Sequence, residues 1–404
     1  MRASPGFRSR REFLKAAATA AAAPYMLTSA ALGAEGRPPA NDRIVMGAVG
    51  IGGRGNGDMR GFMNSAQVQM VAACDVVLRK REGAKAAIDQ KYGNTDCIAY
   101  NDFREMMLRA DIDAVSVTTP DHWHGLITID ACRHGKDVFC EKPLSLTIRE
   151  GRAMVDAARR YGRVFSSGSQ RVLGDYGGLA KYIRSGAIGE IKEAYVNVWG
   201  PSKPCNLPEQ PVPPGLDWDM WLGPAPWAPF NGARLNFRPW RDYSGGGMTD
   251  WGGHKFGAVI FAMDLQETGP VEVYPPDGKD HKYLTFVYAN GFKLHHMGAP
   301  DITYVGTLGE ASRRQMGKPP RDVPLMGYKG SGGLQGDFLH CVRTREKPFR
   351  DVEFAHRAAT VCHLGNIAYW MNRPLKYDPA KEQFIDDPEA DRWLDRAKRE
   401  PWRL

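Results

Sequence analysis

The sequence predicts two domains: an N-terminal α/β domain with a parallel sheet, and a C-terminal α+β domain with a large, mainly antiparallel open sheet. At 404 residues the chain exceeds the length at which one hydrophobic core keeps growing. Up to residue 165, short β-branched runs alternate with helical stretches, which is typical of a parallel sheet. Beyond it, strand-like runs follow one another, and Asn290-Gly291 is a hairpin signal. We expect the first domain over residues 43–165 and the second over 166–404.

The first residues are expected to direct export and to take no part in the fold. A twin-arginine pair, Arg10-Arg11, precedes an alanine-rich run over residues 16–23. We therefore expect a twin-arginine signal peptide over residues 1–34 and a linker over 35–42. The apolar run is too short for a stable transmembrane helix. The expected partner is the twin-arginine export machinery, and the expected location is the periplasm or another compartment outside the cytoplasm.

Charge argues against a nucleic acid partner, and the cysteine spacing argues against a C-x-x-C motif. The formal net charge is +8, but residues 1–34 hold five basic residues and one acidic residue, so the mature chain keeps about half of it. No basic run interleaved with aromatic residues follows, so no nucleic acid partner is expected. The seven cysteines show no C-x-x-C pair. We expect buried free thiols, with one disulfide as the alternative.

A glycine-rich turn follows the first predicted strand, residues 43–49. Gly50, Gly52 and Gly55 have the G-x-G-x-x-G spacing, which turns a strand tightly into a helix and leaves backbone N–H groups free for a pyrophosphate. The cofactor-binding residues expected in this turn are Gly50, Gly52, Gly53, Arg54 and Gly55.

An acidic residue, Asp75, ends the second predicted strand. It lies 20 positions beyond Gly55, where a carboxylate would accept hydrogen bonds from the ribose hydroxyls of NAD. Arg79, Lys80 and Arg81 are close enough in sequence to neutralise a 2′-phosphate. NAD is the expected cofactor, NADP stays open, and Arg79 is a further expected cofactor contact.

Two polar clusters follow later predicted strands, and ligands of a parallel sheet lie beyond the carboxyl ends of its strands. We expect cofactor contacts from Thr119, Pro120, His122, His124, Glu141 and Lys142, with a structural hydrogen-bonding role as the alternative for His122. His122 and His124 have no third ligand at a usable spacing, so no metal is expected.

The chain resembles the glucose-fructose oxidoreductase/inositol dehydrogenase/MocA family over nearly all of its mature length. The resemblance rests on the glycine loop, Thr119-Pro120-Asp121-His122-Trp123-His124, Glu141-Lys142-Pro143, Gly168-Ser169-Gln170-Arg171, Ser185-Gly186-Ala187-Ile188-Gly189 and Asp250-Trp251-Gly252-Gly253-His254. It implies that Lys142 contacts substrate and nicotinamide, that the Lys142-Pro143 bond is cis, and that Asp250 and His254 meet the substrate opposite the lysine. It also implies a homodimer or homotetramer.

The substrate side is expected in the second domain. The expected substrate-binding residues are Gln170, Arg171, Tyr176 and Trp251. Residues 199–243 hold five tryptophans and many prolines. Such a segment could form the floor of a sugar site or pack on a neighbouring subunit, and both interpretations stay open.

Hydride transfer from a secondary alcohol needs a base for the hydroxyl proton and a cation near the developing alkoxide. We expect His254 as the acid/base, Asp250 as its orienting carboxylate or a hydroxyl ligand, and Lys142 as the positioning and proton-sharing group. Which of Lys142 and His254 takes the proton is left open.

The predicted function is NAD(P)-dependent oxidation of a secondary hydroxyl of a sugar, sugar derivative or cyclitol. Because an exported enzyme meets no nucleotide pool, the cofactor should be tightly bound and regenerated in the cycle. One alternative is a glycoside hydrolase or lyase that works by transient oxidation, elimination and re-reduction. A second is a non-catalytic nucleotide- or sugar-binding protein.

Overall fold

The computed structural model describes residues 38–297 and 299–404. The predicted signal peptide lies outside the described residues. Contacts within the chain divide it at Arg43, and the compact unit Ile44–Leu404 holds both sheets. None of the described helices is long and apolar enough to cross a membrane.

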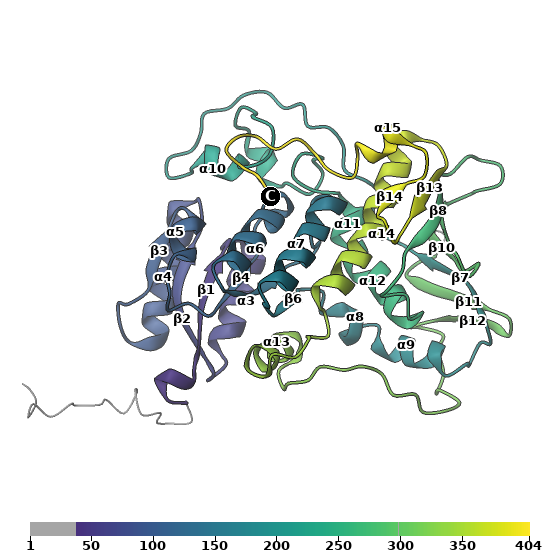
Figure 1. The fold of residues 1–404 in the computed structure, drawn as a ribbon, viewed down its shortest axis with the longest axis horizontal. Coiled ribbons are helices and arrows are strands. Elements are labelled where there is room, and N and C mark those ends of the chain that lie inside the picture. The colour runs from purple at the N-terminus through teal and green to yellow at the C-terminus, as the bar shows by residue number, and fades with distance from the viewer. Residues whose placement is uncertain (1–37, 298) are drawn as a thin grey trace, which may run out of the picture. The chain divides into compact units, whose positions relative to one another are not determined.

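The first sheet is parallel, as predicted, with strand order β3-β2-β1-β4-β5-β6 (Figure 1). Helices accompany it, so β4, β5 and β6 are buried along their whole length. The strands are β1 (Ile44–Val49), β2 (Val68–Cys74), β3 (Ile98–Tyr100), β4 (Ala114–Val117), β5 (Asp137–Cys140) and β6 (Phe165–Ser167). The helices are α3 (Gly53–Met63), α4 (Leu78–Tyr92), α5 (Phe103–Met107), η2 (Asp121–Trp123), α6 (His124–Arg133) and α7 (Ile148–Arg160).

The second sheet has the order β12-β11-β7-β10-β9-β8-β13-β14 and is antiparallel except for the β7–β10 pair, which confirms the predicted fold class. Gly291 has φ +82 in the turn between β9 and β10, as the hairpin signal predicted. The strands are β7 (Ile191–Val196), β8 (Pro270–Tyr274), β9 (Leu284–Tyr288), β10 (Lys293–His296), β11 (Ile302–Gly306), β12 (Gly309–Ser312), β13 (Leu375–Asp378) and β14 (Gln383–Phe384).

Helices α12 and α14 pack on each other and form the core beneath the second sheet. Both helices are apolar over most of their length, and most residues of each are buried. The helices of this half are α8 (Arg171–Gly174), α9 (Gly177–Arg184), α10 (Trp218–Leu222), η3 (Gly232–Leu235), α11 (Gly247–Asp250), α12 (Gly252–Ala262), α13 (Gly333–Thr344), α14 (Val352–Met371) and α15 (Pro388–Asp391).

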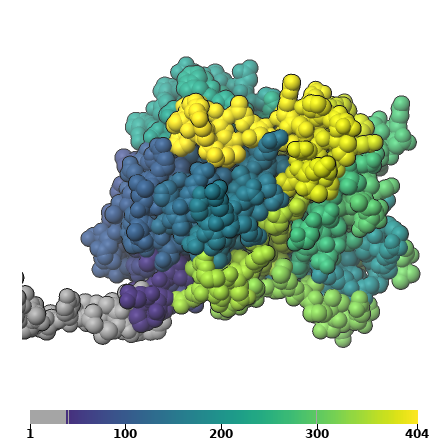
Figure 2. Space-filling model, in the orientation of Figure 1, coloured from purple at the N-terminus to yellow at the C-terminus, as the bar shows by residue number. Residues whose placement is uncertain are grey.

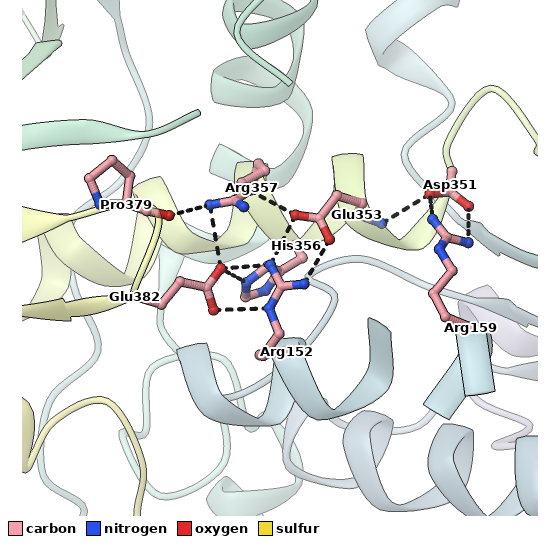
Figure 3. A network of polar contacts seen from close by, with 8 residues as sticks. All are labelled: Arg152, Arg159, Asp351, Glu353, His356, Arg357, Pro379 and Glu382. Carbon is pink, nitrogen blue, oxygen red and sulfur yellow. Dashed lines mark hydrogen bonds and ion pairs between the residues drawn. The ribbon is translucent and has the colours of Figure 1, made fainter. Parts of the chain in front are cut away.

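An ion-pair network joins α7 of the first half to α14 of the second (Figure 3). Arg152 on α7 lies 2.8 Å from Glu353 on α14 and 2.7 Å from Glu382, which precedes β14. Nε2 of His356 lies 2.7 Å from the same Glu382 carboxylate. Because His356 is completely buried, this network fixes the two helices in one register.

The segment of residues 199–243 connects β7 to α11 and extends along the carboxyl end of the parallel sheet (Figure 1). The amide of Leu78 donates to the carbonyl of Gly215 at 2.8 Å, and the amide of Asp217 donates to Val76 at 3.0 Å. Figure 2 shows the C-terminal residues, in yellow, against this segment. The segment therefore belongs to the second half of the chain but covers the first.

All seven cysteines are free, and six are buried, which confirms the expected thiols.

Candidate active site

A cavity of about 1260 Å³ extends along the carboxyl end of the parallel sheet. Its walls come from the glycine turn, the ends of β2, β4 and β5, the 199–243 segment, and the helices α8, α11 and α12. Ligands of parallel sheets bind at this edge. The cavity is large enough for a dinucleotide together with a sugar.

The glycine turn fits a pyrophosphate. Gly50 has φ +83, and a Cβ there would lie 2.7 Å from the backbone of Thr118; a Cβ on Gly55 would lie 1.9 Å from the Gly50 oxygen. Nothing lies within 4 Å of a Cβ on Gly52 or Gly53, and both line the cavity. Helix α3 begins at Gly53, so its first N–H groups lie at the cavity wall. The turn thus combines two glycines needed for packing with two that leave space for a ligand.

Asp75 lines the cavity and also stabilises the glycine turn. Its two carboxylate oxygens accept from the amides of Ile51, at 2.7 Å, and Val77, at 2.8 Å. A carboxylate has lone pairs beyond these two, so ribose hydroxyls fit as well. Arg79 and Lys80 line the same end of the cavity, whereas Arg81 donates to Asp75 O and Asn101.

Glu141 contacts both Arg54 of the glycine turn and its own neighbour Lys142. Arg54 lies 2.8 Å from Glu141 and 2.9 Å from Asp58, and the amide of Lys142 donates to Glu141 at 3.1 Å. Burial raises the pKa of Glu141, and Arg54 opposes this effect. Both Arg54 and Glu141 line the cavity, as do Thr119 and Pro120.

His122 and His124 are placed behind the cavity wall. Both are buried, with 1% of their surface exposed, because η2 and the start of α6 turn them inward. His122 Nε2 lies 2.9 Å from the Trp221 carbonyl; His124 lies between the carbonyls of Pro143, at 2.7 Å, and Thr119, at 2.9 Å. The structure thus corrects the expected cofactor contacts to structural ones. No metal-binding cluster occurs among the described residues.

The lysine after β5 forms an ion pair across the cavity. Lys142 Nζ lies 2.5 Å from Asp250 Oδ1, and Nε of Arg238 lies 3.1 Å from the same oxygen. Burial favours the neutral acid, but the two cations hold the pKa of Asp250 below its usual value. The Lys142-Pro143 bond is cis, as the resemblance implied.

His254 also lines the cavity, and its partner is Ser169 rather than Asp250. Helices α11 and α12 are separated at Trp251, so Asp250 ends the first helix and His254 lies in the first turn of the second. Ser169 Oγ lies 3.0 Å from His254 Nδ1 and donates to the Gly253 carbonyl at 2.8 Å. Because the hydroxyl has one hydrogen, Nδ1 carries the imidazole hydrogen and Nε2 is the acceptor. Burial and the charge of Lys142 lower the pKa of His254 to about 2, so the ring is neutral.

Residues 44–169 match the family model described as "Oxidoreductase family, NAD-binding Rossmann fold", and residues 194–404 match the one described as "Oxidoreductase family, C-terminal alpha/beta domain". The chain belongs to the Gfo/Idh/MocA oxidoreductase family. The family assignment covers both halves and accounts for the glycine turn in an NAD-binding Rossmann domain.

The curated relatives of this chain are named for different activities. An inositol 2-dehydrogenase of Salmonella typhimurium is 33% identical over 147 residues, which is 36% of this chain and 42% of the relative. A D-glucoside 3-dehydrogenase of Escherichia coli is 32% identical over 142 residues, 35% of this chain and 38% of the relative. A 2,7-anhydro-N-acetylneuraminate hydratase of Mediterraneibacter gnavus is 33% identical over 125 residues, 28% of this chain and 33% of the relative. The matches thus span between a third and about two fifths of these relatives.

Solved structures share the fold. Myo-inositol 2-dehydrogenase from Lactobacillus plantarum has a TM-score of 0.60 at 19% identity, covering 83% of this chain and 100% of its own. Aldose-aldose oxidoreductase from Caulobacter crescentus, complexed with glycerol, has a TM-score of 0.57 at 19% identity, covering 83% and 99%. At this identity the likeness concerns the fold alone.

The substrate end of this Gfo/Idh/MocA site differs in part from the expectation. Gln170, Arg171 and Trp251 line the cavity with the lysine, aspartate and histidine. Tyr176 does not, because it is buried at the N-cap position, just before α9, and its hydroxyl donates to Asp301 at 3.0 Å. Its expected substrate contact is therefore corrected to a structural one.

Sequence reasoning missed Arg238 and the tautomer-setting role of Ser169, although Ser169 stood within a recognised motif. Arg238 lies in an irregular segment without periodicity, so only the fold brings it to Asp250.

Proposed function

We propose that this protein is an NAD(P)-dependent oxidoreductase acting on a secondary hydroxyl of a sugar, sugar derivative or cyclitol. The observation that carries the proposal is one cavity lined at one end by the glycine turn and at the other by Lys142, Asp250 and a neutral His254. Its walls supply an anion site, a cation and a base, which is what alcohol oxidation requires.

NAD or NADP, when bound, would accept the hydride from the carbinol carbon. The substrate hydroxyl would approach Lys142 and His254. Nε2 of the neutral imidazole would accept the proton, since Nδ1 already carries one. Lys142 would stabilise the oxygen as its negative charge develops, and Asp250 would hold the ammonium and accept from a neighbouring hydroxyl.

We further propose that the cofactor is retained between turnovers. Pro213, Pro214 and Leu216 line the cavity together with Asp75 and the glycine turn, so the 199–243 segment covers that end. Asn101 donates to Asp217 at 2.8 Å and adds to the two backbone bonds that hold this cover. A retained cofactor suits an enzyme that Arg10-Arg11 would direct out of the cytoplasm, and a homodimer or homotetramer through the open face of the second sheet is part of the same proposal.

A second candidate is cleavage by transient oxidation, elimination and re-reduction. It is favoured by the hydratase among the relatives and by glycosyl hydrolase family 109 proteins of Shewanella, one of which is 33% identical over 125 residues, 30% of this chain and 27% of the relative. The same lysine and histidine could move the protons that elimination needs. A non-catalytic binding protein is the third candidate.

One experiment separates these candidates. The purified protein is denatured and the released nucleotide identified; the intact holoprotein is then incubated with sugars, cyclitols and glycosides. Net oxidation with an electron-accepting second sugar supports the oxidoreductase, whereas release of the aglycone with no net redox change supports the second candidate. Bound nucleotide without any product supports the binding protein, and absence of nucleotide affinity would refute both enzymatic candidates.

A further inference from the structure

The substrate end of the cavity carries more positive than negative groups. Lys142, Arg171 and Arg238 line it, and Asp250 is the carboxylate that faces them. Asp121 also lines this end, but burial raises the pKa of its carboxyl to about 7, so its negative charge is weakened. Three cations therefore line this end of the cavity, and two of them, Lys142 and Arg238, contact the Asp250 carboxylate.

Arg238 is bound to Asp250 through one of its nitrogens. Its Nε approaches Asp250 Oδ1, the oxygen that Lys142 already holds at 2.5 Å. Its side chain is 49% exposed and stacks on Phe237, with 4.9 Å from Cζ to the ring centre. Among the residues that the structure describes, Nη1 and Nη2 of Arg238 donate no hydrogen bond. A guanidinium oriented by an aromatic ring, with two nitrogens available, matches the geometry of an oxyanion.

Arg171 lies at the same end of the cavity. Its Cζ lies 5.0 Å from the centre of the Trp251 ring, and the residue before that tryptophan is Asp250. Nη1 of Arg171 contacts Asp175, which is not a cavity residue, and 40% of the side chain remains exposed. Arg171 also helps to lower the pKa of His254, so its charge acts on the reaction centre.

We infer that the substrate is an anionic sugar, with a carboxylate or a phosphate ester held by Arg171 and Arg238 while its reacting hydroxyl lies at Lys142 and His254. This inference rests on the proposed function and narrows its substrate class. Each guanidinium already contacts one carboxylate through a single nitrogen, and an anionic substrate would pair with the nitrogens that remain, whereas a neutral sugar would not.

The test compares matched sugars on the holoprotein: glucose, glucuronate and glucose 6-phosphate, and galactose with galacturonate. We expect kcat/KM of an anionic member to exceed that of its neutral counterpart by at least ~10-fold. Comparing glucuronate and galacturonate with glucose 6-phosphate shows whether the site prefers a carboxylate or a phosphate ester. The preference should shrink as ionic strength rises, because half-exposed charges are screened.

Arg171→Gln and Arg238→Gln should each reduce the preference ratio by at least ~5-fold, mainly through KM. Lys203→Gln is the matched control, since Lys203 is an exposed cation on the same segment and does not line the cavity. Thermal unfolding of each variant shows whether it folds. Equal kcat/KM for neutral and anionic members in the unaltered protein would overturn the inference while leaving the proposed function intact.

If no sugar is turned over, ligand binding measured by thermal stabilisation tests the anion site. Thermal stabilisation of the holoprotein by anionic members beyond their neutral counterparts, lost in Arg238→Gln, would support the anion site even though the proposed oxidation failed. Equal stabilisation, or none, would reject it.

Discussion

Lys142 Nζ and Asp250 Oδ1 approach to 2.5 Å across the cavity, one from the end of β5 and the other from the end of α11. Their side chains are only 16% and 13% exposed. This pair therefore joins the cofactor-binding half of the chain to the half that carries His254. A partly desolvated ion pair of this kind is stabilising only while both members are present.

Lys142→Met should lower kcat by at least ~10²-fold, because the hydroxyl oxygen loses the cation that stabilises its developing charge. Nucleotide content should stay near that of the unaltered protein, since the glycine turn is untouched. Steady-state rates and the nucleotide released on denaturation check both points. Lys192→Met, at an exposed position on β7, is the control. Undiminished turnover in Lys142→Met would refute the assigned role.

Ser169→Ala should reduce kcat about 10-fold with KM within about 2-fold, because the imidazole of His254 loses the partner that fixes its tautomer. Nitrogen NMR of the His254 ring should show the hydrogen on Nδ1 in the unaltered protein and a mixture in the variant. A ring with its hydrogen on Nε2 in the unaltered protein would contradict the assignment.

The sequence predicted the first half of the site better than the second. The glycine turn, Asp75 and Lys142 could be predicted from local pattern, because each lies within one or two residues of the end of a short apolar run that predicts a strand. Arg238 obeys no such rule, because it reaches Asp250 from an irregular segment.

Histidine orientation could not be read from spacing. His122 and His124 stand after a strand, as cofactor ligands often do, but η2 and the start of α6 point both rings inward. Asp250 was expected to orient His254, yet Asp250 pairs with Lys142 and His254 contacts Ser169.

Gly52→Val should weaken nucleotide binding by at least ~10-fold, about 1.4 kcal/mol, with little change in the stability of the cofactor-free protein. No atom lies within 4 Å of a Cβ at Gly52, and its extended backbone accepts a β-branched residue. The side chain would instead occupy the space for the pyrophosphate.

The matched control is Gly57→Ala on the exposed side of α3, where a Cβ is equally free of contacts. It should stabilise the helix by about 0.5–1 kcal/mol and leave nucleotide binding unchanged. Nucleotide titration and thermal unfolding measure both variants. Equal affinity in Gly52→Val and the unaltered protein would show that the phosphates bind elsewhere.

Arg399→Ala should speed cofactor release. Nη1 of Arg399 lies 2.5 Å from Asp219 and its Nε donates to the Gly223 carbonyl at 3.0 Å, so it anchors the segment that covers the cofactor end. We expect nucleotide to be lost at least ~5-fold faster on dilution, by analogy with the weakening of other charge-assisted hydrogen bonds. Arg403→Ala, which removes an exposed pair with Glu400, is the control. Equal rates of nucleotide release in both variants would show that the contacts of Arg399 do not contribute to cofactor retention.

Glu382→Gln should destabilise the protein at neutral pH and have progressively less effect in acid. Burial alone would raise the pKa of Glu382, but hydrogen bonds from His356 and Arg152 outweigh it and lower the pKa to about 2 (Figure 3). A carboxyl with a depressed folded-state pKa contributes stability above its unfolded value, near 4.5, and loses it as pH falls toward 2. With allowance for solvent screening, we expect about 1–2 kcal/mol at pH 7.

Urea unfolding of Glu382→Gln and the unaltered protein at about pH 7, 4 and 3 measures this difference. Glu389→Gln is the control, because Glu389 is 74% exposed and pairs only at the surface with Arg373. If the difference in free energy of unfolding between Glu382→Gln and the unaltered protein stays constant from pH 7 to 3, Glu382 contributes by packing. If that difference disappears as the pH falls, Glu382 contributes through its charge, because protonation removes the charge but leaves the shape of the side chain unchanged. The joining of α7 to α14 is then electrostatic.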